Sequence, residues 1–391
     1  MSRIYLDHAA TTHMRPEAAA EWLAVSQQVG NASSLHTSGR AARRVVEQAR
    51  ESIAEDLGVR PSAVIFTGGG TESDNLAVKG LFWEMSKNEG PRHIVTSDIE
   101  HHAVLDPILW LRDHQGAPVT FLRVNSVGEV DLDQLAELLA HDQLALVSIM
   151  WANNEIGVIQ PVAEIAAMCT EFNVPFHTDA VQAFGQLPLR LEEIGATAVT
   201  LSSHKIGGPV GVGALIIDSH RKVTPVLHGG GQEREIRSGT LDPASIAAFA
   251  MASKLAVSDL DSHAEKMREL QSYLIESVMR VVPEARLNGP QPGSEYDRLP
   301  NNIHFSFPGC EGDSLLMLLD AAGIDCSTGS ACTAGIPEPS HVLLAMGVDE
   351  KTARASLRFS IGRSTTRGEI DRLAEVLPGV VERATRAGSV S

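Results

Sequence analysis

The sequence predicts an α/β fold, with a large domain around a mostly parallel seven-stranded sheet and a smaller α+β domain. Three observations predict it. Short, nearly continuous apolar runs alternate with helical patterns over the first two-thirds of the chain, which is typical of a parallel sheet covered on both faces. The chain has 391 residues, too many for one small core. After Pro243 the alternation gives way to longer helical patterns.

The individual elements follow from these patterns. We expect the strands of the large domain at residues 63–67, 93–97, 119–124, 144–150, 174–179, 198–202 and 213–217, with helices at 131–141 and 162–172 among those between them. The second domain is expected to contain helices at 245–257, 264–282, 313–322 and 367–386, and strands at 302–307 and 355–360. The boundary is predicted near residue 260, with residues 13–260 in the large domain and residues 1–12 and 261–391 in the small one.

The composition excludes several classes of protein. The formal net charge of −17 argues against direct binding of nucleic acid, because phosphate backbones attract basic surfaces. No apolar run approaches the roughly 20 residues that span a bilayer, and the first residues do not resemble a signal peptide. Four cysteines in this length do not make a disulfide framework, so we expect a cytoplasmic protein that does not contact a membrane.

A glycine-rich turn follows the first of these strands. Gly68, Gly69, Gly70 and Thr71 lead into a predicted helix. Free N–H groups at a helix N-terminus favour a phosphate, and glycine allows it to approach closely. The alternative is an ordinary tight turn with Thr71 as the N-cap.

Two further strand ends carry polar side chains. Lys205, accompanied by Ser202 and His204, follows residues 198–202, and a shielded lysine can form an imine with an aldehyde cofactor. A surface lysine beside a glycine turn is the alternative. Asp179 ends another strand, with Gln182 three residues later. An acid there suits the ring nitrogen of pyridoxal phosphate (PLP), or it caps a helix.

Three other residues are candidates for contact with a cofactor or substrate. His101 can stack on a cofactor ring or move protons; a metal pair with His102 is disfavoured because adjacent residues do not share one face of an element. Arg358 lies in an apolar strand and needs an anion, which is either a structural carboxylate or the carboxylate of an amino-acid substrate. Asn154 follows a strand and could donate to the same carboxylate or to the cofactor.

One cysteine has the surroundings of a nucleophile. Cys332 is flanked by glycine, alanine, serine and threonine, which predicts an accessible loop, and accessible thiols of lowered pKa are the reactive ones. Cys169 lies in an apolar helical pattern and is expected in the core, whereas Cys310 and Cys326 are ambiguous. A metal site of Cys326, Cys332 and His341 lacks a fourth ligand, so we expect no metal.

These motifs, in this order, resemble the cysteine desulfurases, fold-type I PLP enzymes of the aminotransferase class V group. The resemblance runs from residue 5 to residue 363. Its strongest strings are Thr71-Glu72-Ser73-Asp74-Asn75, Glu100-His101-His102-Ala103-Val104, Asn153-Asn154-Glu155-Ile156-Gly157, Ser203-His204-Lys205, Arg237-Ser238-Gly239-Thr240 and Gly329-Ser330-Ala331-Cys332-Thr333. The residues after Cys332 resemble the iron–sulfur-assembly group, in which a long catalytic loop delivers sulfur directly to acceptors.

The resemblance implies a role for each candidate. Lys205 would hold PLP and move protons, His101 would stack on the ring, Asp179 would pair with the ring nitrogen, and Cys332 would take the sulfur of L-cysteine as a persulfide, leaving L-alanine. The remaining implied contacts are Gln182 with the ring hydroxyl, Gly70, Thr71, Ser202 and His204 with the phosphate, Thr240 with the phosphate of the partner subunit in a homodimer, and Asn154 and Arg358 with cofactor or substrate. Asp7-His8-Ala9-Ala10 and Gly69-Gly70 depart from the commonest form of their motifs without disturbing these roles.

The implied function is sulfur supply from L-cysteine for iron–sulfur cluster assembly or tRNA thiolation, with a scaffold or a thiolation enzyme as sulfur acceptor. The alternatives are a selenocysteine lyase, a PLP aminotransferase and, least favoured, a sulfur-relay scaffold without catalysis. The sequence leaves open the acceptor, the preference between cysteine and selenocysteine, the role of Cys326, and whether an iron–sulfur cluster binds transiently at Cys332.

Overall fold

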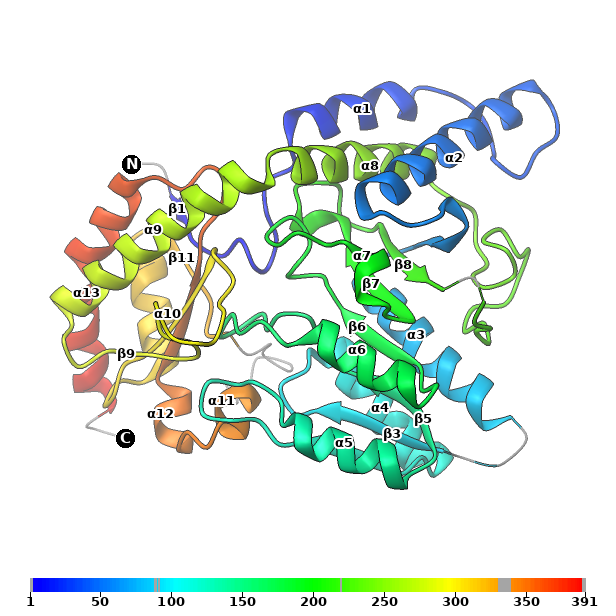
Figure 1. Cartoon of the computed structure of the whole chain (residues 1–391). Helices are drawn as coiled ribbons and strands as arrows, with labels where there is room; N and C mark the ends of the chain where they lie inside the picture. Colours follow the sequence, from blue (N-terminus) through cyan, green and yellow to red (C-terminus); the bar gives the residue numbers. More distant parts are fainter. Residues whose placement is uncertain (1–2, 88–89, 91, 219, 330–338, 389–391) are drawn as a thin grey trace.

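The computed structural model describes residues 3–87, 90, 92–218, 220–329 and 339–388. Its main sheet has seven strands in the order β2-β8-β7-β6-β5-β3-β4 (Figure 1). They are β2 (Val64–Thr67), β3 (His93–Ser97), β4 (Val119–Leu122), β5 (Leu144–Ser148), β6 (Phe176–Asp179), β7 (Ala198–Ser202) and β8 (Gly213–Ile217). Among these strands β8 pairs antiparallel with β2 and β7, and the other pairs are parallel. The seven predicted strands are therefore confirmed, with ends that shift by three residues or fewer.

Helices cover both faces of this sheet because its strands are apolar on both sides. One face packs against α3 (Gly70–Ser86) and α4 (His102–Gln115). The other packs against α2 (Thr37–Leu57), α5 (Leu132–His141), α6 (Val162–Glu171) and α8 (Pro243–Ser258). Successive residues of β2 point to opposite faces of the sheet: Ile65 packs with the layer of α3 and α4, and Phe66 packs with the layer on the other face. The helices α1 (Pro16–Ser26) and α2 lie along α8, and α7 (Leu191–Ile194) is a short turn.

A second apolar core surrounds a small antiparallel sheet. This sheet has β10 (Asn302–Ser306) between β12 (Ser356–Ser360) and β9 (Arg286–Leu287). The helices α9 (Leu260–Val281), α10 (Gly312–Ala321) and α13 (Arg367–Gly388) pack on it, and α11 (His341–Ala345) and α12 (Glu350–Arg354) precede β12.

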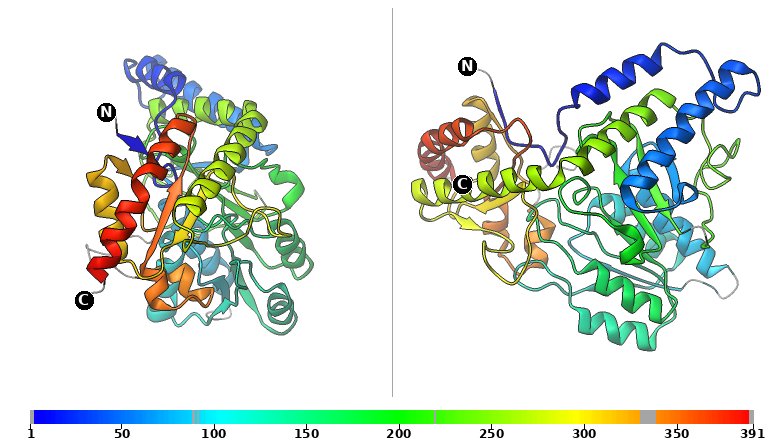
Figure 2. Two further views of the ribbon diagram at one scale, coloured as in Figure 1. Left: turned by 90° about the vertical axis from the view of Figure 1, so that its left-hand side faces the viewer. Right: turned by 45° about the horizontal axis from the view of Figure 1, so that its top comes forward.

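The first residues of the chain join this second core. β1 (Ile4–Tyr5) pairs in parallel with β11 (Ile324–Asp325), and Ile4 and Leu6 are buried in the second core. Both described ends of the chain lie on this side of the molecule (Figures 1 and 2). Two separate cores support our proposed division near residue 260, with residues 1–12 assigned to the small domain. No helix in the described part of the chain combines the length and apolar character needed to cross a bilayer.

Candidate active site

A cavity of about 340 Å³ lies where the parallel strands of the main sheet end and the small sheet begins. All but two of the predicted site residues line it: Gly70, Thr71, His101, Asn154, Asp179, Gln182, Ser202, His204, Lys205 and Arg358. Thr240 is exposed and lies elsewhere on the surface. Cys332 lies outside the described residues. Strand-end positions far apart in the sequence therefore meet in one cavity, as expected for parallel sheets.

The glycine-rich turn presents a helix N-terminus to this cavity. Gly69 is the N-cap of α3, with φ of 141°, and no side chain accepts a hydrogen bond from the first turn. An L side chain is strained at that φ, which explains the glycine. The alternative in which Thr71 caps the helix is wrong, because Thr71 lies inside the first turn with Gly70 before it. The uncapped N–H groups, together with Thr71, can bind an anion.

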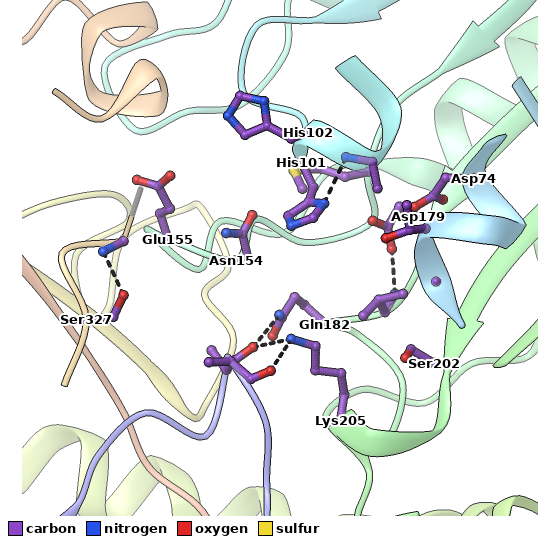
Figure 3. Close-up of a pocket in the computed structure, with 18 of the residues that line it drawn as sticks. Asp74, His101, His102, Asn154, Glu155, Asp179, Gln182, Ser202, Lys205 and Ser327 are labelled. Carbon is purple, nitrogen blue, oxygen red and sulfur yellow. Dashed lines mark hydrogen bonds between the residues drawn. The ribbon is translucent and has the colours of Figure 1, made fainter. Parts of the chain in front are cut away.

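Lys205 is held by the backbone of the first residues of the chain. Its Nζ donates to the carbonyl oxygens of Ala9 at 2.5 Å and Ala10 at 2.8 Å (Figure 3). Burial, helped by the positive charge of Arg358, lowers the pKa of Lys205 to about 8, although Asp179 partly opposes the shift. A lysine with this pKa is uncharged near neutral pH far more often than an ordinary lysine, and its uncharged form can act as a nucleophile or base. The surface-lysine alternative is therefore wrong.

Asp179 ends β6 with its carboxylate in the cavity wall. Its Oδ1 accepts a hydrogen bond of 2.8 Å from the Val181 N–H, which closes a turn. No helix begins at Ala180, so the helix-cap alternative is wrong. Burial raises the pKa of Asp179 to about 6, while the Val181 N–H and the charge of Lys205 oppose that rise. Such a carboxylate gains most from a cationic partner inside the cavity.

His101 is both a helix cap and a wall of the cavity. Its Nδ1 accepts from the Ala103 N–H at 3.0 Å at the start of α4. The residue is exposed to solvent, yet enough protein surrounds the ring to lower its pKa to about 4, with the charge of Lys205 as a further cause. The ring is therefore neutral at physiological pH and presents its Nε2 and its face for other contacts.

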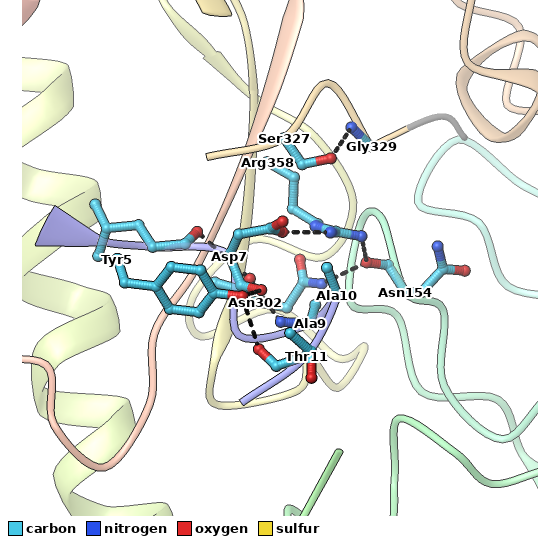
Figure 4. Close-up of polar contacts among 12 residues, drawn as sticks. Tyr5, Asp7, Ala9, Ala10, Thr11, Asn154, Asn302, Ser327, Gly329 and Arg358 are labelled. Carbon is cyan, nitrogen blue, oxygen red and sulfur yellow. Dashed lines mark hydrogen bonds and ion pairs between the residues drawn. The ribbon is translucent and has the colours of Figure 1, made fainter. Parts of the chain in front are cut away.

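The small sheet supplies Arg358. Its Nη2 donates to Asp7 Oδ1 at 2.7 Å and its Nη1 to the Asn154 carbonyl at 3.0 Å, while its buried Nε has no hydrogen-bond partner among the described residues (Figure 4). The structural carboxylate that the sequence left open is thus Asp7. The guanidinium still lines the cavity, so binding of a substrate carboxylate stays a prediction.

The other residues that were predicted to contact the phosphate or the ring of the cofactor lie around Lys205. His204 Nδ1 lies 3.1 Å from Thr11 Oγ1, and burial lowers the pKa of His204 to about 4. The Gln182 Nε2 donates to the Ala9 carbonyl at 3.0 Å. Ser202 is buried at the end of β7, beside the Cβ position of Gly70.

The described cysteines have core surroundings. Cys169 is buried, as predicted, and burial raises its pKa to about 12. Cys326 packs against the core of the small sheet, and burial likewise raises its pKa to about 12. Cys310 is buried against α13. Thiols with raised pKa hold little thiolate and make poor nucleophiles.

Sequence reasoning missed several residues at the cavity. The sequence showed one motif that contains Asp7, Ala9 and Ala10, but it assigned no role to the Asp7 side chain or to the backbone carbonyls of the two alanines. Asp74, Glu155, His102, Ser327, Gly329 and His341 also line the cavity. Asp74 and Glu155 belong to two of the sequence strings that carry the family resemblance. An acidic residue in such a string could have marked each of them as a candidate for the site. The described residues contain no cluster of three or more His, Cys, Asp or Glu side chains that could hold a metal ion.

The residues present fit PLP. An uncapped helix N-terminus with Thr71, Ser202 and His204 nearby suits its phosphate. A lysine of lowered pKa suits its aldehyde, and the buried carboxylate of Asp179 suits a protonated ring nitrogen.

Comparison with known proteins agrees with this chemistry. The family model described as aminotransferase class-V matches residues 4–373. An IscS-like cysteine desulfurase of Mycobacterium tuberculosis is 54% identical over 98% of this chain and 97% of its own length. A cysteine desulfurase IscS of Dictyoglomus turgidum is 43% identical over 97% of this chain and 95% of its own length. A solved NifS-like protein superposes with a TM-score of 0.89 at 36% identity, covering 97% of this chain and 100% of that one.

These matches cover almost the whole chain, including the segment with Cys332. The protein belongs to the PLP-dependent aminotransferase class-V family, among relatives that are cysteine desulfurases of the IscS and NifS kind.

Proposed function

We propose that the protein is a PLP-dependent cysteine desulfurase that converts L-cysteine to L-alanine and retains the sulfur as a persulfide on Cys332. One observation carries the proposal: Lys205, with its lowered pKa, and the buried Asp179 line one cavity together with residues from both sides of the Cys332 segment. Those residues are Gly329 before the segment and His341 after it.

Different residues of the cavity would bind different parts of PLP. The phosphate of PLP would be held by the N-terminus of α3 together with Thr71, Ser202 and His204. Gly70 has no side chain, which leaves room for the phosphate to approach the helix. Asp179 would face the ring nitrogen, Gln182 the ring hydroxyl and His101 the face of the ring. When bound, PLP supplies an electron sink for the electrons released at the substrate Cα.

Lys205 and Arg358 act on the substrate. The Lys205 amine, uncharged in part near neutral pH, accepts the Cα proton and returns a proton to the carbon product. Arg358 and Asn154, which both line the cavity, would orient the substrate carboxylate.

Cys332 takes the sulfur. Its thiolate forms an S–S bond with the substrate sulfur as the Cβ–S bond breaks, and the carbon product takes up a proton and leaves as alanine. Gly329, three residues before Cys332 in the sequence, lines the cavity. On the other side of the segment, the Ser340 hydroxyl donates to Glu155, which also lines the cavity.

The proposed turnover is tested by adding L-cysteine to the purified holoenzyme and measuring alanine, sulfide and the visible absorbance of bound PLP together. We expect the absorbance to shift and alanine to form with a sulfur acceptor present. A shift without alanine would discard cysteine as the substrate. Faster turnover of selenocysteine would favour a selenocysteine lyase, and turnover that requires a keto acid would favour an aminotransferase.

We further propose a homodimer in which Thr240 reaches the phosphate of the partner subunit. Two exposed apolar side chains lie near the segment of Thr240: Val29 is 89% exposed and Trp22 is 40% exposed, and both line a hollow with Asp242, two residues after Thr240. Leu35, just before α2, is 84% exposed. We propose that these exposed apolar side chains belong to the interface of the homodimer. The sulfur acceptor is proposed to be an iron–sulfur scaffold or a thiolation enzyme, and the cytoplasmic location stays a prediction.

Substituting Val29→Asp is expected to shift the protein towards monomer in analytical ultracentrifugation and to weaken PLP binding, because Thr240 would leave its target site. Thr240→Ala should weaken PLP binding without changing the mass of the assembly. A Val29→Asp protein that remains dimeric would exclude this face as the interface. As a control, Val210→Asp changes another side chain that is 75% exposed and should leave the mass of the assembly unchanged.

A further inference from the structure

A second buried carboxylate lies beside Asp179. Asp74 belongs to the second turn of α3, is 1% exposed and lines the cavity. Figure 3 shows its side chain next to that of Asp179 on the same wall of the cavity. Two carboxylates this close in a poorly solvated site cannot easily both carry a charge, so one of them retains a proton.

The hydrogen bonds around the two acids differ. Asp179 accepts the Val181 N–H at 2.8 Å and lies near the charge of Lys205, and both favour its ionised form. The Oδ1 of Asp74 has no hydrogen-bond partner in the described structure. No lysine or arginine forms an ion pair with Asp74 among the described residues. The proton of the pair is therefore favoured on Asp74.

The groups on neighbouring strands surround Asp74 with neutral donors. Thr200 of β7 makes a hydrogen bond to the Asp74 carboxyl that favours its ionised form, but burial and the charge of Asp179 oppose ionisation more strongly. The Thr200 hydroxyl also lies 3.0 Å from His177 Nε2, and His177 Nδ1 lies 2.8 Å from Ser148 Oγ. His177 Nε2 is 3.5 Å from Asp74 Oδ1, but burial lowers the pKa of His177 to about 3, so the ring carries no charge.

One further acid is near. Glu100 is 1% exposed, and burial raises its pKa to about 8. Its negative form would oppose ionisation of Asp74 further. Burial, followed by the charge of Asp179, raises the pKa of Asp74 well above its ordinary value. The titratable groups that face Asp74 in the described structure, Asp179, Glu100 and His177, are therefore either neutral or negative.

We propose that Asp74 is a positioning residue that keeps its proton in the holoenzyme and thereby confines the negative charge of the pair to Asp179, where it faces the ring nitrogen. This inference rests on the proposed role of Asp179 towards PLP. It explains why an acid buried without a cationic partner is compatible with the fold, because a protonated carboxyl costs far less to bury than a carboxylate.

The test uses Asp74→Asn, which resembles a protonated carboxyl in shape and charge. A group whose pKa is raised in the folded state binds a proton that the unfolded chain has released above the ordinary value of 3.8. The stability of the wild type therefore falls as the pH rises above that value, up to the raised pKa. The amide of the variant has no such dependence, so the melting temperature of the variant relative to wild type should rise as the pH increases above the ordinary value.

A second readout is infrared absorption. The wild-type holoenzyme should show carbonyl stretches of protonated carboxylic acids at neutral pH from both Asp74 and Glu100, and Asp74→Asn should lose the Asp74 component while the Glu100 component remains. Asp179→Asn is the matched comparison, because it removes the ionised partner and should weaken PLP binding strongly. A melting temperature of Asp74→Asn that falls below wild type as the pH rises, with the infrared spectrum unchanged, would show that Asp74 is ionised and would overturn the proposal.

Neither measurement depends on turnover of cysteine, so failure of the proposed reaction would leave them interpretable. If Asp74→Asn does not fold, Thr200→Val provides the second variant. The Thr200 hydroxyl is a donor that favours the ionised form of Asp74, so its removal should leave the Asp74 component of the infrared spectrum in place at neutral pH or strengthen it. Absence of the Asp74 component from the spectra of both wild type and Thr200→Val would show an ionised Asp74 and contradict the proposal.

Discussion

Replacing Cys332 with serine is expected to abolish alanine formation from L-cysteine while PLP remains bound. A serine hydroxyl does not ionise near neutral pH and is a far weaker nucleophile towards sulfur, so we expect the rate to fall by about 10³-fold or more. The visible absorbance should still shift on addition of cysteine, because Lys205, Asp179 and Arg358 remain in the cavity. The measurement is alanine formation together with mass spectrometry of the persulfide.

Cys326→Ser is the matched control, because Cys326 lies six residues earlier and its thiol packs on the core of the small sheet. Burial raises its pKa to about 12, so it holds little thiolate, and alanine formation should persist. Wild-type turnover by Cys332→Ser, with the persulfide found on Cys326, would show that Cys326 and not Cys332 is the nucleophile.

Replacing Lys205 with alanine is expected to lower turnover by about 10²–10⁴-fold, the range for loss of a positioned acid or base, and to remove the covalent link to PLP. Lys205→Arg separates chemistry from structure. Arginine can still donate to the Ala9 and Ala10 carbonyls that hold the native Nζ, but it does not lose its proton in proteins. Equal loss in both variants would show that turnover needs an amine able to lose its proton, for the imine or for proton transfer, whereas activity retained in the arginine variant would reduce Lys205 to a structural cation.

The lowered pKa of Lys205 also predicts a pH dependence. The rate at which apo-enzyme recaptures PLP should rise with pH as the amine loses its proton and should level off above about pH 8. An amine at its ordinary value of 10.5 would give a rate that continues to rise throughout the alkaline range. Stopped-flow absorbance distinguishes the two curves, and the Lys205→Ala variant gives the background for binding without the amine.

Much of the architecture followed from local pattern. The seven strands of the main sheet were predictable because each is a short apolar run buried on both faces, and such runs contrast sharply with the amphipathic helices between them. Their ends shifted by a few residues, since hydrogen bonding with neighbours, absent from the sequence, decides where a strand stops. The rule that parallel strands end at one edge then placed Thr71, Asp179 and Lys205 together.

The contacts between segments that are distant in the sequence were decided only by the tertiary structure. The anion for Arg358 is Asp7, 351 residues away, and the acceptors for Lys205 are carbonyls 196 and 195 residues away. No local pattern encodes such pairs, because they depend on how the first residues cross from the small sheet to the main one. The burial that lowers the pKa of Lys205, and the approach of Asp74 to Asp179, likewise arise only when the helices pack. The sequence by itself determined which groups are available for the chemistry, and packing decided their protonation, because charge in a buried site depends on neighbours and solvent rather than on residue type.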